Sequence, residues 1–195
     1  NDTFWTASEE TAMNTGQTML VLGAFTMLSI FALNTNRMMV GSVEFGLEME
    51  ATLNAASIGQ SMLDEILSKS FDENATQEKI YQATEATPEN LFGTDASDEV
   101  ITGIDSLYQS KSKYDDVDDY HLYRRVVRDS RLGLFYVIDS VKYVEETTPD
   151  RSSATQTFYK VITVAVMNQS LPKQVNTDQV IPVILRDISI YRRYF

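Results

Sequence analysis

The feature that most constrains this chain is a long uncharged stretch close to its N-terminal end. Residues 11–36 contain no Asp, Glu, Lys or Arg, and the apolar core Met19–Leu33 lies inside this stretch. No proline occurs before Pro88, so nothing prevents a helix from continuing to about Ser70. One end of such a helix suits lipid or an apolar protein bundle, whereas its other end suits water.

The length of the apolar run matches a bilayer only when its uncharged flanks are included. As an α-helix, Met19–Leu33 extends roughly 22 Å, which is shorter than a hydrocarbon core of roughly 30 Å. The wider segment Thr15–Asn36 reaches roughly 33 Å and ends next to the charge of Arg37. We therefore predict a helix that spans a membrane at least transiently. The alternative is the buried core helix of a soluble protein.

The second half of the expected helix, residues 37–70, has an amphipathic pattern. Apolar side chains recur at spacings of mostly three and four, which predicts one face laid against a globular domain. Gly41, Gly46 and Gly59 each cost about 1 kcal/mol relative to alanine, so local melting or kinking is expected there. The predicted apolar face consists of Met39, Val43, Met49, Leu53, Ala56, Met62, Leu63 and Ile66.

The remainder of the chain first turns polar and then alternates in the manner of β-strands. Short helices are expected at 77–83 and 99–108. An antiparallel sheet of about four strands follows, with its apolar face against the helix, which makes the fold class α+β. The expected strands are 120–128, 132–146, 155–167 and 183–193. The predicted organisation is an apolar segment 1–36, an amphipathic half-helix 37–70, a variable loop region 71–119 and a sheet head 120–195.

Composition and charge exclude several classes of function. With 28 acidic and 16 basic residues, the net charge of −12 repels nucleic-acid phosphates, so a nucleic-acid role is not expected. The chain has no cysteine and therefore neither disulfides nor thiolate metal ligands. The arginines and aromatics of the final segment, Tyr191–Phe195, predict an edge strand or a subunit contact rather than base stacking.

Few residues offer catalytic chemistry. His121 is the only histidine, and no phosphate-binding loop or nucleophile elbow is present, so we expect neither an enzyme nor a cofactor. The best ligand candidates are four aspartates, which suggest calcium, with Asp72 and Glu73 able to join if the loop folds back. The alternative is a hydrogen-bonded turn paired with Arg124, Arg125 or Arg128. The four aspartates are Asp115, Asp116, Asp118 and Asp119.

Three triplets match the acceptor pattern for N-linked glycosylation, and they begin at Asn1, Asn74 and Asn168. The candidate glycosylation sites are Asn74 and Asn168.

Two segments and the overall plan resemble the type IV pilin and pseudopilin superfamily. The segment Ala55–Glu73, AASIGQSMLDEILSKSFDE, is similar to the helix end of many prepilin-like proteins. Tyr114–His121, YDDVDDYH, is similar to the loop before the sheet in that superfamily, including minor pilins of haemagglutinin-type pili. The resemblance covers most of the chain and implies a filament subunit with a helical core and a β-rich head.

The beginning of the chain departs from the family pattern. The family normally has a glutamate at the fifth position of the mature chain, but Trp5 stands there, and Glu9 and Glu10 precede the apolar run. Counting from Gly16 as a cleavage glycine places Val21 fifth. We expect Asn1 to be a processed start, and Glu9 or Glu10 to substitute for the missing glutamate.

The sequence thus predicts a structural subunit of an extracellular, pilus-like filament. Its expected partners are further copies of itself, the pilus assembly machinery, and the inner membrane before assembly. The alternatives are a minor pilin or pseudopilin that primes or tips a fibre, and a single-pass receptor whose head binds a ligand outside the cell. The side chains expected to pack the filament core are Leu20, Leu22, Phe25, Leu28, Ile30 and Phe31.

Overall fold

The computed structural model describes residues 3–94 and 97–192, with side chains from Thr15 onward except at position 77. The chain divides into two units, Asn1–Leu47 and Glu48–Phe195. The first unit is the N-terminal part of the single helix α1 (Thr3–Leu67), which continues into the second unit. The helix is continuous through Gly41, Gly46 and Gly59. It ends at Leu67, three residues before the predicted end.

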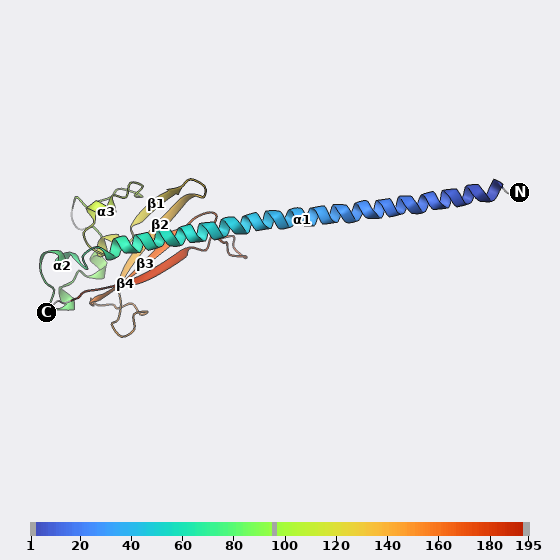
Figure 1. Ribbon diagram of the computed structural model, residues 1–195. Helices are drawn as coiled ribbons and strands as arrows, with labels where there is room; N and C mark the ends of the chain where they lie inside the picture. Colours follow the sequence, from blue (N-terminus) through green and yellow to red (C-terminus); the bar gives the residue numbers. More distant parts are fainter. Residues whose placement is uncertain (1–2, 95–96, 193–195) are drawn as a thin grey trace. The chain divides into compact units, whose positions relative to one another are not determined.

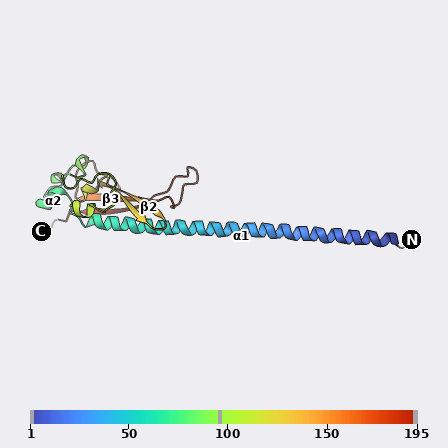
Figure 2. The same cartoon turned by 90° about the horizontal axis from the view of Figure 1, so that it is seen from above.

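The second unit is an α+β head, as the sequence predicted. Four antiparallel strands form one sheet in the order β1-β2-β3-β4, so each strand pairs with its neighbours in the chain. The residues of α1 from Glu48 onward lie along one face of this sheet (Figures 1 and 2). The strands are β1 (Arg124–Asp129), β2 (Gly133–Tyr143), β3 (Tyr159–Met167) and β4 (Val183–Ile190).

The helix buries a different stripe from the one predicted. Ala51 and Ala55 are fully buried, and Gly59 follows one turn later, whereas Leu53 is exposed. A Cβ at Gly59 would lie 2.7 Å from Cδ1 of Leu185, so a larger residue at this position would require the Leu185 side chain to shift. Of the predicted face, only Met62, Leu63 and Ile66 are buried. Further towards the N-terminus, the small residues Ala51, Ala55 and Gly59 face the sheet instead.

The loop region contains less helix than expected. The predicted helix 99–108 is wrong: Gly103 has a φ of +84°, and Asp105 instead forms a bridge with Arg125. The predicted helix 77–83 is also wrong, because α2 (Glu73–Gln77) starts earlier, where the Asp72 carboxylate accepts a bond from the Asn74 amide. Three short 3₁₀ turns and one short helix complete the region: η1 (Ala83–Glu85), η2 (Glu89–Leu91), α3 (Ser110–Lys113) and η3 (Asp118–Tyr120).

Strand boundaries also shift by a few residues. The first strand begins at Arg124 rather than at position 120, because η3 ends at Tyr120 and a turn with a positive φ at Leu122 follows it. The third begins at Tyr159 rather than at position 155. The fourth ends at Ile190, so the predicted extension through Tyr191 and Arg192 is wrong, and Arg193 lies outside the described part of the chain.

Candidate functional site

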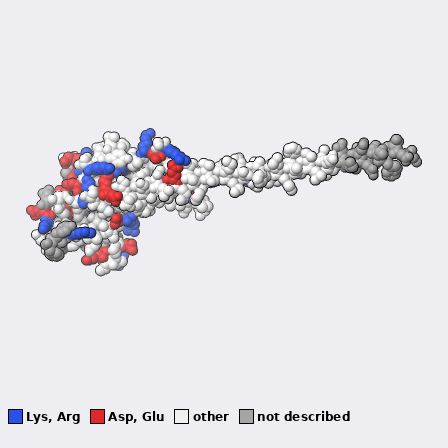
Figure 3. Space-filling view, viewed as in Figure 1, with Lys and Arg blue, Asp and Glu red and all other residues white. Residues whose placement is uncertain are grey.

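The first candidate surface is the apolar part of α1. Every residue from 15 to 46 is exposed, and the helix is long and apolar enough to cross a membrane. Figure 3 shows a long uncharged stretch of this helix. The six predicted core side chains are between 59% and 76% exposed, and they are Leu20, Leu22, Phe25, Leu28, Ile30 and Phe31. Soluble monomers rarely expose a continuous apolar surface of this extent, and exposed apolar surfaces of such extent are typical of protein or membrane interaction sites.

The hydroxyl groups on this helix bind back to its own backbone. Thr26 Oγ1 donates to the carbonyl of Gly23 at 2.8 Å, and Ser29 Oγ donates to the carbonyl of Phe25 at 2.8 Å. Polar groups satisfied within the helix cost little in an apolar environment, whether that environment is lipid or a helix bundle. Glu9 and Glu10, expected to substitute for the missing glutamate, lie outside the side chains that the structure describes.

A buried cation joins the end of the helix to the sheet. Lys160 on β3 donates from Nζ to Oδ2 of Asp72 at 2.8 Å and to Oδ1 of Asp118 at 2.7 Å. It also donates to the carbonyl of Phe71 at 2.8 Å, and the rings of Phe71 and Phe92 lie 4.5 and 4.9 Å from Nζ. The Lys160 side chain is fully buried, so this fully bonded arrangement fixes the Asp72 segment and η3 against the sheet.

A second buried network connects α1 to β1. Arg125 Nη1 donates to Oε2 of Glu65 at 2.8 Å, and its Nη2 donates to Oε1. Ser110 and Tyr120 also donate to Glu65, at 2.7 and 3.1 Å. Burial opposes ionisation of Glu65, but the hydrogen bonds from Arg125 and Ser110 outweigh it and lower the pKa of Glu65. Tyr123 donates to Asp105 at 2.6 Å in the same network.

One buried carboxyl has no partner among the described residues. Both oxygens of Asp139 on β2 lack a hydrogen bond, and burial raises the pKa of Asp139 well above its usual range, although the charge of Arg125 opposes this. Burial therefore favours the neutral form of Asp139. Its position could have been read from the sequence, because it shares strand parity with the buried residues Val137 and Val141.

The four predicted calcium ligands do not converge on one point. Asp118 faces Lys160, whereas carboxylate oxygens of Asp115 and Asp119 lie with Glu99 within 4.8 Å of one another. A second trio combines Asp115 and Asp116 with Glu73. Each trio supplies three of the six to eight oxygens that calcium takes, so the calcium site stays a prediction.

Hydrogen bonds within the loop match the alternative, a turn. The Asp115 amide donates to Oδ2 of Asp119 at 3.2 Å, and the Asp119 amide donates to Oδ1 of Asp116 at 3.1 Å. Burial, followed by the charges of neighbouring carboxylates, raises the pKa of Asp119 to about 7 and that of Asp116 to about 9. The expected arginine partner is wrong, because Arg125 pairs with Glu65 and Lys160 takes its place at Asp118.

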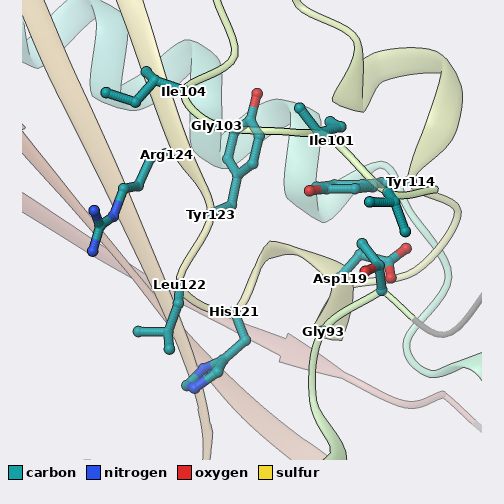
Figure 4. Close-up of a pocket in the computed structure, with 12 residues that line it drawn as sticks. Gly93, Ile101, Gly103, Ile104, Tyr114, Asp119, His121, Leu122, Tyr123 and Arg124 are labelled. Carbon is teal, nitrogen blue, oxygen red and sulfur yellow. The ribbon is translucent and has the colours of Figure 1, made fainter.

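A hollow of the head lies beside this loop. It has a volume of about 460 Å³ and is lined by Tyr114, Asp119 and Tyr123, among others. The side chains of His121 and Arg124 extend away from Tyr114 and Asp119 (Figure 4). Nδ1 of His121 lies 2.9 Å from the carbonyl of Val141, so this histidine is engaged with the sheet backbone.

The two predicted glycosylation sites differ in accessibility. Asn74 is exposed, whereas Asn168 is buried and donates from Nδ2 to the carbonyls of Leu132 and Leu134 at 3.0 and 2.9 Å. An enzyme cannot reach the Asn168 nitrogen in the folded head, so the structure leaves only Asn74 accessible.

Comparisons with protein families, curated proteins and solved structures found no match for this chain. The long N-terminal helix and the four-stranded antiparallel sheet are compatible with a pilin-like α+β fold.

Proposed function

We propose that this chain is the structural subunit of an extracellular, pilus-like filament that polymerises through the apolar half of α1. The observation that carries the proposal is the exposure of all six predicted core side chains on one continuous helix, with Phe25 at 62% and Leu20 at 76%. Before assembly this helix resides in the inner membrane, and the pilus assembly machinery extracts it. In the filament, the helices of many copies cover each other while the heads face water.

Burial of the apolar side chains alone does not account for transfer of the helix from the membrane into a filament. Burying a Leu or Phe side chain from water contributes about 1.5–3 kcal/mol, but transfer from lipid to a helix bundle gains far less. Close packing must therefore stabilise the bundle. Gly16 and Gly23 have open space around the position of a Cβ, so a neighbouring helix can approach their backbone.

The test is a charge placed within the predicted core. Phe25→Asp should abolish filaments in material sheared from the cell surface, as seen by negative-stain microscopy and mass spectrometry. Val175→Asp is the matched control, because Val175 is 98% exposed on the head and should tolerate the same change. Normal filaments from the Phe25 variant would refute the proposal.

A second candidate is a single-pass receptor with a ligand-binding head. The hollow of about 460 Å³ beside Tyr114 and Asp119 favours it, since small-molecule sites commonly have volumes of this order. A receptor stays with detergent-extracted membranes, whereas a filament subunit is released by shearing. Recovery of the wild-type chain only in the membrane fraction would favour the receptor.

A further inference from the structure

The sheet of the head has one face that α1 does not cover. Gly59 of α1 lies against Leu185 and Val166, so these residues mark the covered face. Side chains alternate along a strand, so Ile184 and Arg186, on either side of Leu185, point away from the helix. We call the outward-pointing positions of the four strands the outer sheet face.

The outer sheet face is basic in an acidic protein. Pairing places Arg186 opposite Thr163, Lys142 opposite Val161 and Arg128 opposite Leu134 in adjacent strands, and Arg124 opposite Ile138. All four cations are exposed, and none of them forms an ion pair among the residues that the structure describes. No Asp or Glu occupies an outward position of any of the four strands.

Exposed apolar side chains lie between these cations. Tyr136 is 42% exposed, Ile184 is 57% exposed and Ile190 is 47% exposed. A face that combines apolar area with unpaired arginines resembles the composition of protein interfaces, in which Arg and Tyr are enriched. Contact with a partner would bury the apolar area, and the charges would select the orientation of that partner.

The complementary charge is present elsewhere on the same chain. Residues 71–119 contain thirteen Asp and Glu but only three Lys, so they hold most of the excess negative charge of the protein. Several of these carboxylates are buried, but four lie exposed or half-buried around α2, η1 and η2. We call this the acidic surface, and it consists of Glu73, Glu78, Glu85 and Glu89. Glu73, Glu78 and Glu85 line a hollow of about 370 Å³ together with Lys79.

We propose that the outer sheet face of one copy docks on the acidic surface of a neighbouring copy. The contact joins two different surfaces, so a docked pair still presents one free outer sheet face and one free acidic surface, and the series continues as an open helical array. Arginine forks match carboxylates in a bidentate manner, which fixes the register between the two heads. The inference rests on the proposed filament, in which the helical core holds heads at high effective concentration and makes weak ion pairs sufficient.

A charge-reversal series on the full chain tests this contact. Arg128→Glu combined with Arg186→Glu should lower the yield of sheared filaments by about tenfold, which is the effect of losing one well-formed charge pair. Glu78→Lys combined with Glu89→Lys should do the same, and the four changes together should restore the yield. Arg151→Glu with Lys173→Glu is the matched control, because both side chains are exposed and lie on neither surface.

The outcomes separate this inference from the proposed function. Absence of filaments from the wild-type chain overturns the filament itself. Wild-type filaments with an unchanged yield from Arg128→Glu/Arg186→Glu overturn the head contact alone. If that variant instead loses binding of anionic vesicles while filaments persist, the occupant of the face is a lipid surface and the inference is wrong.

Cross-linking tests the pairing directly, because the chain has no cysteine of its own. Thr163→Cys lies on the outer sheet face beside Arg186, and Thr84→Cys lies in η1 beside Glu85. Oxidation of filaments that contain both variants should give disulfide-linked dimers, and each variant alone should give none. Dimers from Thr163→Cys alone would show a symmetric sheet-to-sheet contact and overturn the inference.

Discussion

The Nζ of Lys160 lies 2.8 Å from Oδ2 of Asp72, and neither side chain is exposed to solvent. Asp72 follows the end of α1 and also accepts bonds from the amide and hydroxyl of Thr87. The pair therefore joins the helix end, the loop region and β3 at one point. Buried ion pairs of this kind fix a unique arrangement, although they add little net stability compared with an apolar core.

Removing the cation should destabilise the head strongly. Lys160→Met leaves Asp72 and Asp118 buried without their partner, and we expect the unfolding free energy to fall by about 3–5 kcal/mol. Denaturant unfolding of the full chain in detergent, followed by near-ultraviolet circular dichroism, measures this change. Lys173→Met is the control, because its exposed pair with Asp178 should contribute about 0–1 kcal/mol. Equal effects of the two changes would contradict the structural role of Lys160.

The close approach at Gly59 predicts a steric effect. Gly59→Val places a Cβ 2.7 Å from Leu185 Cδ1, and overpacking of this kind should lower the unfolding free energy by about 1–3 kcal/mol. Adding Leu185→Ala should recover part of the loss, because it removes the clashing atom. Gly46→Val serves as the control, since it meets no atom within 4 Å. The same unfolding assay measures both variants. An equal loss of unfolding free energy at Gly46 and Gly59 would argue against close packing of α1 on the sheet at Gly59.

The aspartate loop predicts that the head becomes less stable as pH rises. Burial raises the pKa of Asp116 to about 9 and that of Asp119 to about 7, whereas an unfolded aspartate titrates near 3.9. The folded state therefore holds protons that the unfolded state releases. The contribution of these two carboxyl groups to the unfolding free energy is fully present below about pH 4 and is lost as the pH rises towards 9. These groups should make the unfolding free energy lower at pH 8 than at pH 5.

A substitution at Asp116 tests whether the aspartate loop causes this pH dependence. Asp116→Asn keeps the acceptor oxygen for the Asp119 amide but cannot ionise, so it should flatten the decline between pH 5 and pH 8. Asp150→Asn, on an exposed turn, is the matched control and should leave the slope unchanged. An unaltered slope in the Asp116 variant would place the pH dependence elsewhere.

Calcium binding at the aspartate loop should be detectable as a change in thermal stability. A dication held by either trio would offset the repulsion between carboxylates, so calcium at about 1 mM should raise the thermal midpoint at pH 8. Asp115→Asn should remove this shift because Asp115 belongs to both trios. Glu73→Gln and Glu99→Gln then distinguish which trio binds. If calcium does not change the thermal midpoint of the wild-type chain, the loop is a hydrogen-bonded turn and not a calcium site.

Local patterns in the sequence determined the elements of this protein. The uncharged stretch Thr11–Asn36 without proline predicted the continuous helix, and alternation predicted β2 and β3, because both signals act within one element. The α+β class followed from the order of the elements. The six exposed apolar positions of α1 were also readable, because their hydrophobicity does not depend on any other part of the chain.

Only the tertiary structure decided which distant residues meet. The pairing of Lys160 with Asp72 joins residues 88 positions apart, and no local pattern encodes such a contact. The same holds for Glu65 with Arg125, and for the split of the four aspartates between Lys160 and two trios that share Asp115. Burial and the charges of neighbouring groups control the pKa of each carboxylate. Both arise only after the chain has folded, so the sequence alone does not show which carboxylates are ionised.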